Sequence, residues 1–359
     1  MIVLVVIMHL KVTYGDMGLW YYQEQATLDF ITTMVFILYG ALTQAFFMGL
    51  LFFIAGFFTP ASFDKKGLTK FVLDRMVRLG IPSLFFMLVL HPIILLMVAL
   101  HAGTFPPSVP EAYAQYISSL EFLGGSGPLW FAIALLLFSI IYAFVRVFKQ
   151  RPTNNQFNLS HNHLLLMIGL IAFFTFLIRL AQPIGSTFFN MQLGNFAQYI
   201  IMFMAGILTY RLRLLQTFPK LGRSWLKIAL FFGIPLFIFF AVFGGGLQDS
   251  TPFLGGIHWQ AAAFALWESF FCVAISLGLL YTFKVKYDKQ GKLGSFLSQN
   301  GFGVYVLHPL VLVAITLSFS WMSIHPLAKM LLMTSIVLPS CFLFSYLIRK
   351  IPVFRKIFS

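Results

Sequence analysis

The sequence predicts an all-α polytopic membrane protein with about ten transmembrane helices and both termini in the cytoplasm. Two observations carry this prediction. Of the 359 residues, 60% are hydrophobic and only 9% are charged, whereas a soluble domain carries roughly 25% charged residues. The 24 Lys and Arg residues also gather in alternate connections between apolar segments. A chain with so few charges cannot cover a water-facing surface, so the lipid bilayer is its expected partner.

Each predicted span is an apolar run near the roughly 20 residues that a transmembrane helix needs. The runs lie at residues 1–14, 31–58, 80–100, 129–145, 164–180, 196–209, 228–243, 260–282, 302–319 and 327–348. The first run is short, since Asp16 follows after only about 14 residues. We therefore expect either a first helix that tolerates a mismatch with the bilayer or a chain that lacks residues before Met1.

The connections alternate in charge along the chain. Four connections, together with the tail from residue 349, hold 21 of the 24 Lys and Arg residues; they lie at 59–79, 145–162, 210–227 and 283–300. Because cytoplasmic loops carry the excess of Lys and Arg, this alternation places both termini in the cytoplasm and requires an even number of spans. No basic stripe of the kind that binds nucleic acid is present. We expect one transmembrane domain, over 1–359, in the cell (inner) membrane.

Ionisable side chains inside the predicted spans are costly and are therefore candidate functional residues. His9, in VVIMHLKVTYG, could act as a general base, because an unperturbed imidazole titrates near working pH. It could instead form a hydrogen bond between helices. Glu268, in AFALWESFF, could hold the tautomer of a histidine or accept a structural helix–helix hydrogen bond. We interpret His91 as structural.

His308 precedes Pro309 in NGFGVYVLHPLV. Proline removes a backbone donor and frees a carbonyl, to which a neighbouring polar group can bond. Both a helix-kink role and a catalytic role fit this pair. His91 and Pro92 repeat the dipeptide, which lowers its specificity as a motif.

Arg75 and Arg78, in DRMVRLGIP, lie at the cytoplasmic mouth of the third span. Their i, i+3 spacing puts both on one face of an α-helix, and planar guanidiniums suit bidentate phosphate binding. Asp74 could neutralise part of such a site, and ordinary anchoring at the membrane surface is the alternative. Trp130 opens the fourth span, where interfacial aromatic residues are common.

Four stretches together resemble acyltransferase family 3 of membrane O-acyltransferases, and are closest to its glucan-modifying branch. They are VVIMHLKVTYG with His9, FFMGLLFFIAGFFTP with Ala55 in place of the usual Ser, FVLDRMVRLGIP with Arg75, Arg78 and Pro82, and GFGVYVLHPLV with Tyr305 and His308, while GPLWFAIALL around Trp130 adds weaker support. The resemblance covers nearly the whole chain. The family usually has an Arg eleven positions before the first-span His, which falls upstream of Met1 here and also implies an incomplete first helix.

The resemblance implies acyl transfer from cytoplasmic acyl-CoA, such as acetyl-CoA or succinyl-CoA, to a hydroxyl of a cell-envelope carbohydrate or glycan. It implies no permanently bound cofactor, and the sequence shows no metal-ligand spacing. The site residues that we expect are Arg75 and Arg78 for the CoA phosphates, His9 as general base with His308 and Glu268 as further catalytic residues, and Trp130 and Tyr305 for substrate binding.

Two other classes of protein fit part of the pattern. Ten spans with buried His and Glu residues also suit a proton-coupled secondary transporter of a small molecule. Transporters commonly contain inverted repeats with paired broken helices, and the sequence shows none. The third class is a catalytically inactive membrane scaffold, which predicts that His9→Ala leaves the cellular phenotype intact.

Overall fold

The computed structural model describes residues 1–148, 157–216, 218–287 and 289–357. In these ranges the chain forms helices and no strand, with one isolated bridge between Phe188 and Met191. Eight helical segments of the described chain are long and apolar enough to cross a membrane. The predicted all-α polytopic membrane protein is therefore confirmed.

The α-helices are α1 (Ile2–Gly15), α2 (Phe30–Arg75), α3 (Ile81–Phe85), α4 (His91–His101), α5 (Val109–Ser118), α6 (Trp130–Phe148), α7 (His161–Ala181), α8 (Phe196–Arg211), α9 (Phe218–Ile228), α10 (Ile234–Phe243), α11 (Thr251–Leu254), α12 (Trp259–Lys286), α13 (Lys292–Ser318), α14 (Pro326–Ile348) and α15 (Pro352–Ile357). Wider π-helical turns form η1 (Met76–Gly80), η2 (Phe86–Leu90) and η7 (Ala229–Gly233). Short 3₁₀ turns form η3 (Glu121–Gly124), η4 (Gly127–Leu129), η5 (Leu193–Asn195) and η6 (Leu214–Gln216).

Every predicted span falls on one helix or on consecutive helical elements. The helical segment Phe30–His101 is 72 residues long, so it contains both the second and the third predicted spans. The first predicted span corresponds to α1, a shorter apolar helix. The number of crossings and the side on which the termini lie stay predictions.

The predicted connection at 59–79 is itself helical. Helix α2 continues through Pro60 to Arg75, and within it only Gly67 is non-helical, with φ 71° and ψ 175°. Glycine has no Cβ and adopts a positive φ readily, so the chain bends at Gly67 and resumes its helix at once. Turn η1 then joins α2 to α3. Arg75 and Arg78 consequently belong to a nearly continuous helix.

The chain divides into two compact units. Unit 1 consists of Met1–Gly40, Leu73–Leu137 and Gln290–Ser359, and unit 2 consists of Ala41–Val72 and Phe138–Lys289. The prediction of one transmembrane domain over the whole chain stays a prediction.

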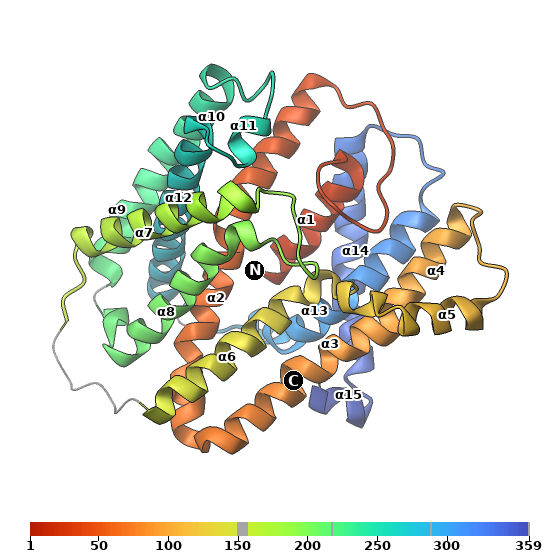
Figure 1. Cartoon of the computed structure of the whole chain (residues 1–359), viewed down its shortest axis with the longest axis horizontal. Coiled ribbons are helices and arrows are strands. Elements are labelled where there is room, and N and C mark those ends of the chain that lie inside the picture. The colour runs from red at the N-terminus through yellow and green to blue at the C-terminus, as the bar shows by residue number, and fades with distance from the viewer. Residues whose placement is uncertain (149–156, 217, 288, 358–359) are drawn as a thin grey trace. The chain divides into compact units, whose positions relative to one another are not determined.

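In unit 1, α1 packs against α13 and α14, which lie side by side (Figure 1). The buried side chains at this contact repeat every four residues along each helix, which is the spacing of one helix face. They include Val6, Leu10 and Tyr14 of α1, Val304 and Leu312 of α13, and Met333, Val337 and Cys341 of α14. His308 lies midway between Val304 and Leu312 on the same face, so it is directed into this packed core.

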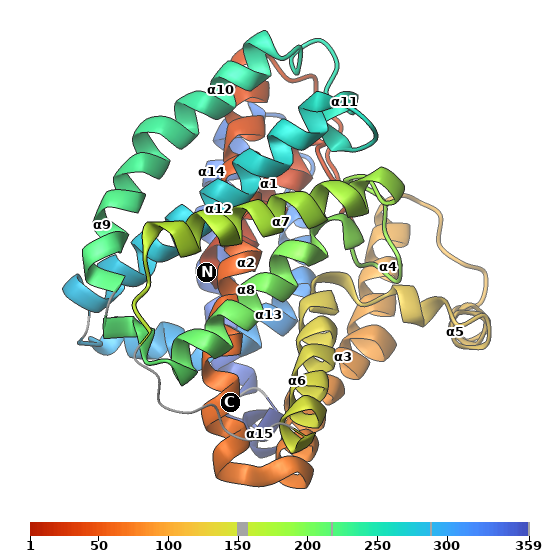
Figure 2. The same cartoon turned by 60° about the vertical axis from the view of Figure 1, so that its left-hand side comes forward.

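In unit 2, α7 and α9 pack against α12 (Figure 2), and α7 also packs against α8. Helices α2 and α8 approach each other through two glycines. A Cβ added to Gly56 would collide with the carbonyl oxygen of Phe203, and one added to Gly206 would collide with that of Phe53. Small residues allow membrane helices to pack with their backbones in contact, so these two positions admit only glycine without a shift of the helices.

Candidate functional site

Two histidines from opposite ends of the chain meet in unit 1. The ring centroids of His9 and His308 are 5.2 Å apart, and the ring planes differ by 22°. Trp20 stacks on His9 at 3.8 Å and 17°, and its ring lies 6.3 Å from that of His308 at 11°. We call these three residues the His–Trp cluster. The structure therefore brings together two of the three residues predicted to be catalytic.

The connection after α1 places Trp20 over the histidines. The chain reverses at Asp16, which adopts a left-handed conformation with φ 48°. The returning segment bonds to α1, because the backbone N–H of Glu24 donates to the carbonyl oxygen of Thr13 at 2.8 Å. Nζ of Lys329, on α14, lies 2.7 Å from both carboxylate oxygens of Glu24. The segment that carries Trp20 is thus fixed to two helices.

The backbone holds His308 in one tautomer. Nδ1 of His308 lies 2.8 Å from the carbonyl oxygen of Tyr305 and 3.2 Å from that of Val304. Carbonyl oxygens only accept, so Nδ1 carries the proton and Nε2 carries the lone pair. The Tyr305 carbonyl is free because Pro309, four residues later, has no N–H. The prediction that a neighbouring polar group bonds to this freed carbonyl is confirmed, and that group is His308 itself.

The lone-pair side of His308 is unused by the protein. The side chain is fully buried, and Nε2 has no hydrogen-bond partner within the part of the chain that the structure describes. His9 is half-buried, and its ring makes no hydrogen bond to any described residue. The cluster therefore offers two neighbouring imidazoles with free ring nitrogens, which are potential proton acceptors.

Replacing Pro309 with Ala should release the tautomer of His308. The new N–H at position 309 can donate to the carbonyl of Tyr305 and compete with Nδ1 of His308. The substitution also removes a proline from the helix interior, where proline destabilises a helix by roughly 3 kcal/mol. We expect a higher melting temperature in detergent. We also expect the Nε2–H tautomer to appear in ¹⁵N spectra of histidine-labelled protein. A purely Nδ1–H spectrum in the Pro309→Ala protein would show that the freed carbonyl does not set the tautomer.

The other membrane His–Pro pair is built differently. Nδ1 of His91 lies 2.9 Å from the hydroxyl of Tyr116, and that hydroxyl donates to the carbonyl of Met87 at 2.7 Å. Because the hydroxyl has one proton, Nδ1 of His91 must be the donor in the first bond. Burial raises the pKa of Tyr116 to about 12, so its hydroxyl keeps that proton. Tyr21 contacts both His91, at 5.5 Å, and Trp20, at 5.1 Å, and connects this structural pair to the His–Trp cluster.

The segment before α6 packs closely against these aromatic residues. Gly127 has φ 48°, and a Cβ there would lie 2.6 Å from the hydroxyl of Tyr21, so the position requires glycine. The hydroxyl of Tyr305 donates to the carbonyl of Pro128 at 2.5 Å, which ties α13 to this segment. Trp130 is half-buried and begins α6 directly after it. Trp130 and Tyr305 were predicted to bind substrate, and the hydroxyl of Tyr305 donates its hydrogen bond to the protein backbone.

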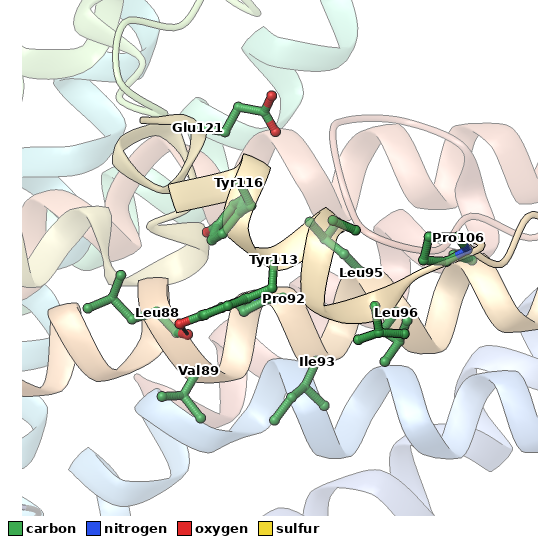
Figure 3. A pocket seen from close by; sticks show the side chains of 13 residues that line it. Leu88, Val89, Pro92, Ile93, Leu95, Leu96, Pro106, Tyr113, Tyr116 and Glu121 are labelled. Carbon is green, nitrogen blue, oxygen red and sulfur yellow. Dashed lines mark hydrogen bonds between the residues drawn. The ribbon is translucent and has the colours of Figure 1, made fainter. Parts of the chain in front are cut away.

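An apolar pocket of about 500 Å³ lies between α4 and α5 (Figure 3). Tyr113 and Tyr116 border it, but the hydroxyl of Tyr113 donates to the carbonyl of Leu88 at 3.0 Å. That carbonyl lacks an α-helical donor because Pro92, four residues later, has no N–H. The hydroxyl of Tyr116 is also bonded to the backbone. Glu121 is the charged residue of the lining, which is otherwise mostly aliphatic. Such a lining suits a hydrocarbon group better than a polar one.

The structure distinguishes the two arginines that were predicted to bind phosphate. Arg75 ends α2 and is half-buried, whereas the side chain of Arg78, inside η1, is 53% exposed. The i, i+3 argument assumes α-helical geometry, and the wider turn of η1 alters the angle between the two side chains. Asp74 neutralises part of the site, as expected, because its carboxylate lies 3.2 Å from Nε of Arg78.

Glu268 lies in unit 2, where it forms a buried ion pair. Its carboxylate is 2.7 Å from Nη2 of Arg179. The same guanidinium donates to Oδ1 of Asn195 at 2.6 Å and to the carbonyl of Gly194 at 3.1 Å. Arg179 is only 1% exposed. Of the two roles considered for Glu268, the helix–helix hydrogen bond is the one observed, and the tautomer of His308 is set by backbone carbonyls instead.

Trp20, Tyr21 and Tyr116 were not predicted as site residues. The only sequence signal for the first two is the run WYY after the first span, which is also typical of an interfacial aromatic belt. Among the described residues, no group of three or more His, Cys, Asp or Glu side chains could hold a metal ion.

A search of curated proteins and a search of solved structures each found no match. The family model described as an acyltransferase domain matches residues 1–350. This range includes the His–Trp cluster and both arginines. The match confirms the resemblance to the family, but it does not confirm the glucan-modifying branch. The chain therefore belongs to acyltransferase family 3 and is a multi-pass membrane acyltransferase.

Proposed function

We propose that the protein transfers an acyl group, such as acetyl or succinyl, from cytoplasmic acyl-CoA to a hydroxyl of a cell-envelope carbohydrate, in the cell membrane. The observation that supports this best is the contact between His9 and His308, whose ring centroids are 5.2 Å apart. In the reaction, the hydroxyl oxygen bonds to the thioester carbon, the carbon–sulfur bond breaks, and the hydroxyl proton passes to a base. A neutral histidine is the commonest such base.

His9 is the proposed general base. It is the less deeply buried member of the pair. Its ring makes no hydrogen bond to the described residues, so a ring nitrogen is left for the acceptor hydroxyl. Nε2 of His308 then accepts a hydrogen bond from a second hydroxyl of the same acceptor. Carbohydrates carry hydroxyls on adjacent carbon atoms, and two neighbouring acceptor nitrogens suit such a pair. This complementarity favours a carbohydrate over an acceptor with a single hydroxyl.

Arg75 and Arg78 are proposed to bind the phosphates of the donor. CoA is polyanionic, and guanidiniums form strong, often bidentate hydrogen bonds with phosphate. Arg78 is exposed, and among the described residues its ion-pair partner is Asp74, one turn away. Surface ion pairs of this kind are weak, so phosphate can replace the carboxylate. The excess of basic residues in this part of the chain supports a cytoplasmic position, where acyl-CoA is found.

Purified protein with labelled acetyl-CoA or succinyl-CoA and glucan oligosaccharides tests the proposal. We expect an acylated saccharide, and saturable acyl-CoA binding whose Kd rises about tenfold or more in Arg75→Ala/Arg78→Ala, because a hydrogen bond to a charged group contributes roughly 1.5–3 kcal/mol. Lys65→Ala/Lys70→Ala is the matched control, since it removes two exposed basic residues of the same helix. Unchanged affinity in the arginine variant would refute the phosphate site. Absence of transfer by folded protein with both donors would refute the proposed reaction.

A further inference from the structure

We infer that Trp20 is a further catalytic residue, whose indole N–H donates a hydrogen bond to the acyl carbonyl oxygen as that oxygen becomes negatively charged. The inference rests on the proposed acyl transfer. Its starting point is that Nε1 of Trp20 is buried and has no hydrogen-bond partner among the described residues. A buried tryptophan N–H normally has a partner, because leaving a buried donor unpaired is destabilising. A bound substrate oxygen would supply the missing acceptor.

The position of this donor matches the needs of acyl transfer. The indole stacks directly on His9, at 3.8 Å between ring centroids, and lies 6.3 Å from His308. The same small region thus contains an N–H donor and the Nε2 acceptor of His308, neither of which has a partner among the described residues, together with the half-buried His9. A proton acceptor beside an oriented donor is the combination that stabilises both the attacking hydroxyl and the developing oxyanion.

The donor is also fixed before substrate arrives. The segment that carries Trp20 is bonded to α1 through Glu24 and Thr13 and to α14 through Glu24 and Lys329. The flanking ring of Tyr21 packs edge-on against the indole at 5.1 Å. A donor that needs no reorganisation at the moment of reaction is far more effective than a solvent molecule.

The inferred step balances without another reactant. The acceptor oxygen bonds to the thioester carbon while its proton moves to His9, and the carbonyl electron pair moves onto the oxygen that accepts from Nε1–H of Trp20. When the carbonyl re-forms, the carbon–sulfur bond breaks and the CoA thiolate takes the proton from His9. Trp20 keeps its proton throughout.

Replacing Trp20 with 3-benzothienylalanine tests the inference, because sulfur replaces the N–H in a ring of nearly the same shape. We expect kcat to fall about 10²–10³-fold, as for removal of one oxyanion donor. We expect the KM for acyl-CoA, the affinity for a non-reactive thioether analogue of acyl-CoA and the melting temperature to stay unchanged. Trp20→Phe should lose a similar factor. Trp321→Phe is the control, since that side chain is 73% exposed and its loss should leave kcat unchanged.

The possible results separate this inference from the proposed function. If the wild-type protein transfers acyl groups and the benzothienyl protein does so equally fast, Trp20 is not an oxyanion donor and only the inference fails. If kcat falls together with a higher KM or a lower melting temperature, Trp20 has a packing role and the inference also fails. If folded wild-type protein transfers nothing, the proposed function fails and the inference fails with it.

Discussion

His9→Asn should reduce kcat by about 10²–10⁴-fold, the usual contribution of a positioned general base. Asn is close to His in size but cannot take up a proton. The protein should still fold, because α1 is held by Val6, Leu10 and Tyr14 and the His9 ring forms no hydrogen bond to the described residues. Acyl-CoA binding should also persist. The measurement is kcat for acyl transfer, with acyl-CoA affinity and melting temperature determined on the same samples.

His101→Asn serves as the control for this prediction, because His101 is exposed at the end of α4. The double variant His9→Asn/His308→Asn should be little slower than the slower single variant, since residues that act as a unit are not additive. If His9→Asn stays within about threefold of wild type while His308→Asn is inactive, the base is His308, and the assignment of His9 is wrong.

Glu268→Ala should destabilise the protein by about 3–5 kcal/mol, the usual cost of breaking a buried ion pair. The substitution leaves the guanidinium of Arg179, which is 1% exposed, without its carboxylate partner. Asn195 and Gly194 can each still accept from it, but neither carries a charge. The expected result is a large fall in the melting temperature or in resistance to denaturant, measured in detergent without substrate.

Two further variants separate a structural role of Glu268 from a catalytic one. Arg179→Met/Glu268→Leu replaces the whole pair with apolar side chains and should recover much of the lost stability. Glu111→Gln, at an exposed carboxylate, should leave the melting temperature unchanged. A Glu268→Ala protein that is as stable as wild type but inactive would show instead that Glu268 is catalytic, as first predicted from the sequence.

The positions of the membrane spans could be predicted because they depend on local composition. Apolar length and the alternation of basic connections placed every predicted span on a helix. The helical form of the connection at 59–79 could not be predicted, because it depends on a positive φ at one glycine, Gly67. The π-helical turns η1 and η2 also lack a sequence signal that distinguishes them from α-helix. Arg78 lies inside η1, so the i, i+3 argument from α-helical geometry does not apply directly to Arg75 and Arg78.

The candidate site could be predicted only in part. His308 shares the spacing of Val304 and Leu312, so its direction towards a packed face can be read from the sequence. That His9 is the residue it meets depends on how α1 rotates against α13, which only the three-dimensional packing determines. Trp20 was missed because its place depends on an ion pair between Glu24 and Lys329, whose partners lie at opposite ends of the chain.

The discontinuity of unit 1 has a consequence for biosynthesis. Chains are made and fold from the N-terminus, but α1 packs against α13 and α14, which are made only after α2 to α12. Residues 41–72 and 138–289, which form unit 2, are complete before then. Helix α1 must therefore wait without these packing partners while the residues of unit 2 are made. Any nascent chain that stops before residue 308 carries only half of the histidine pair, so the proposed site can form only after α13 has been made.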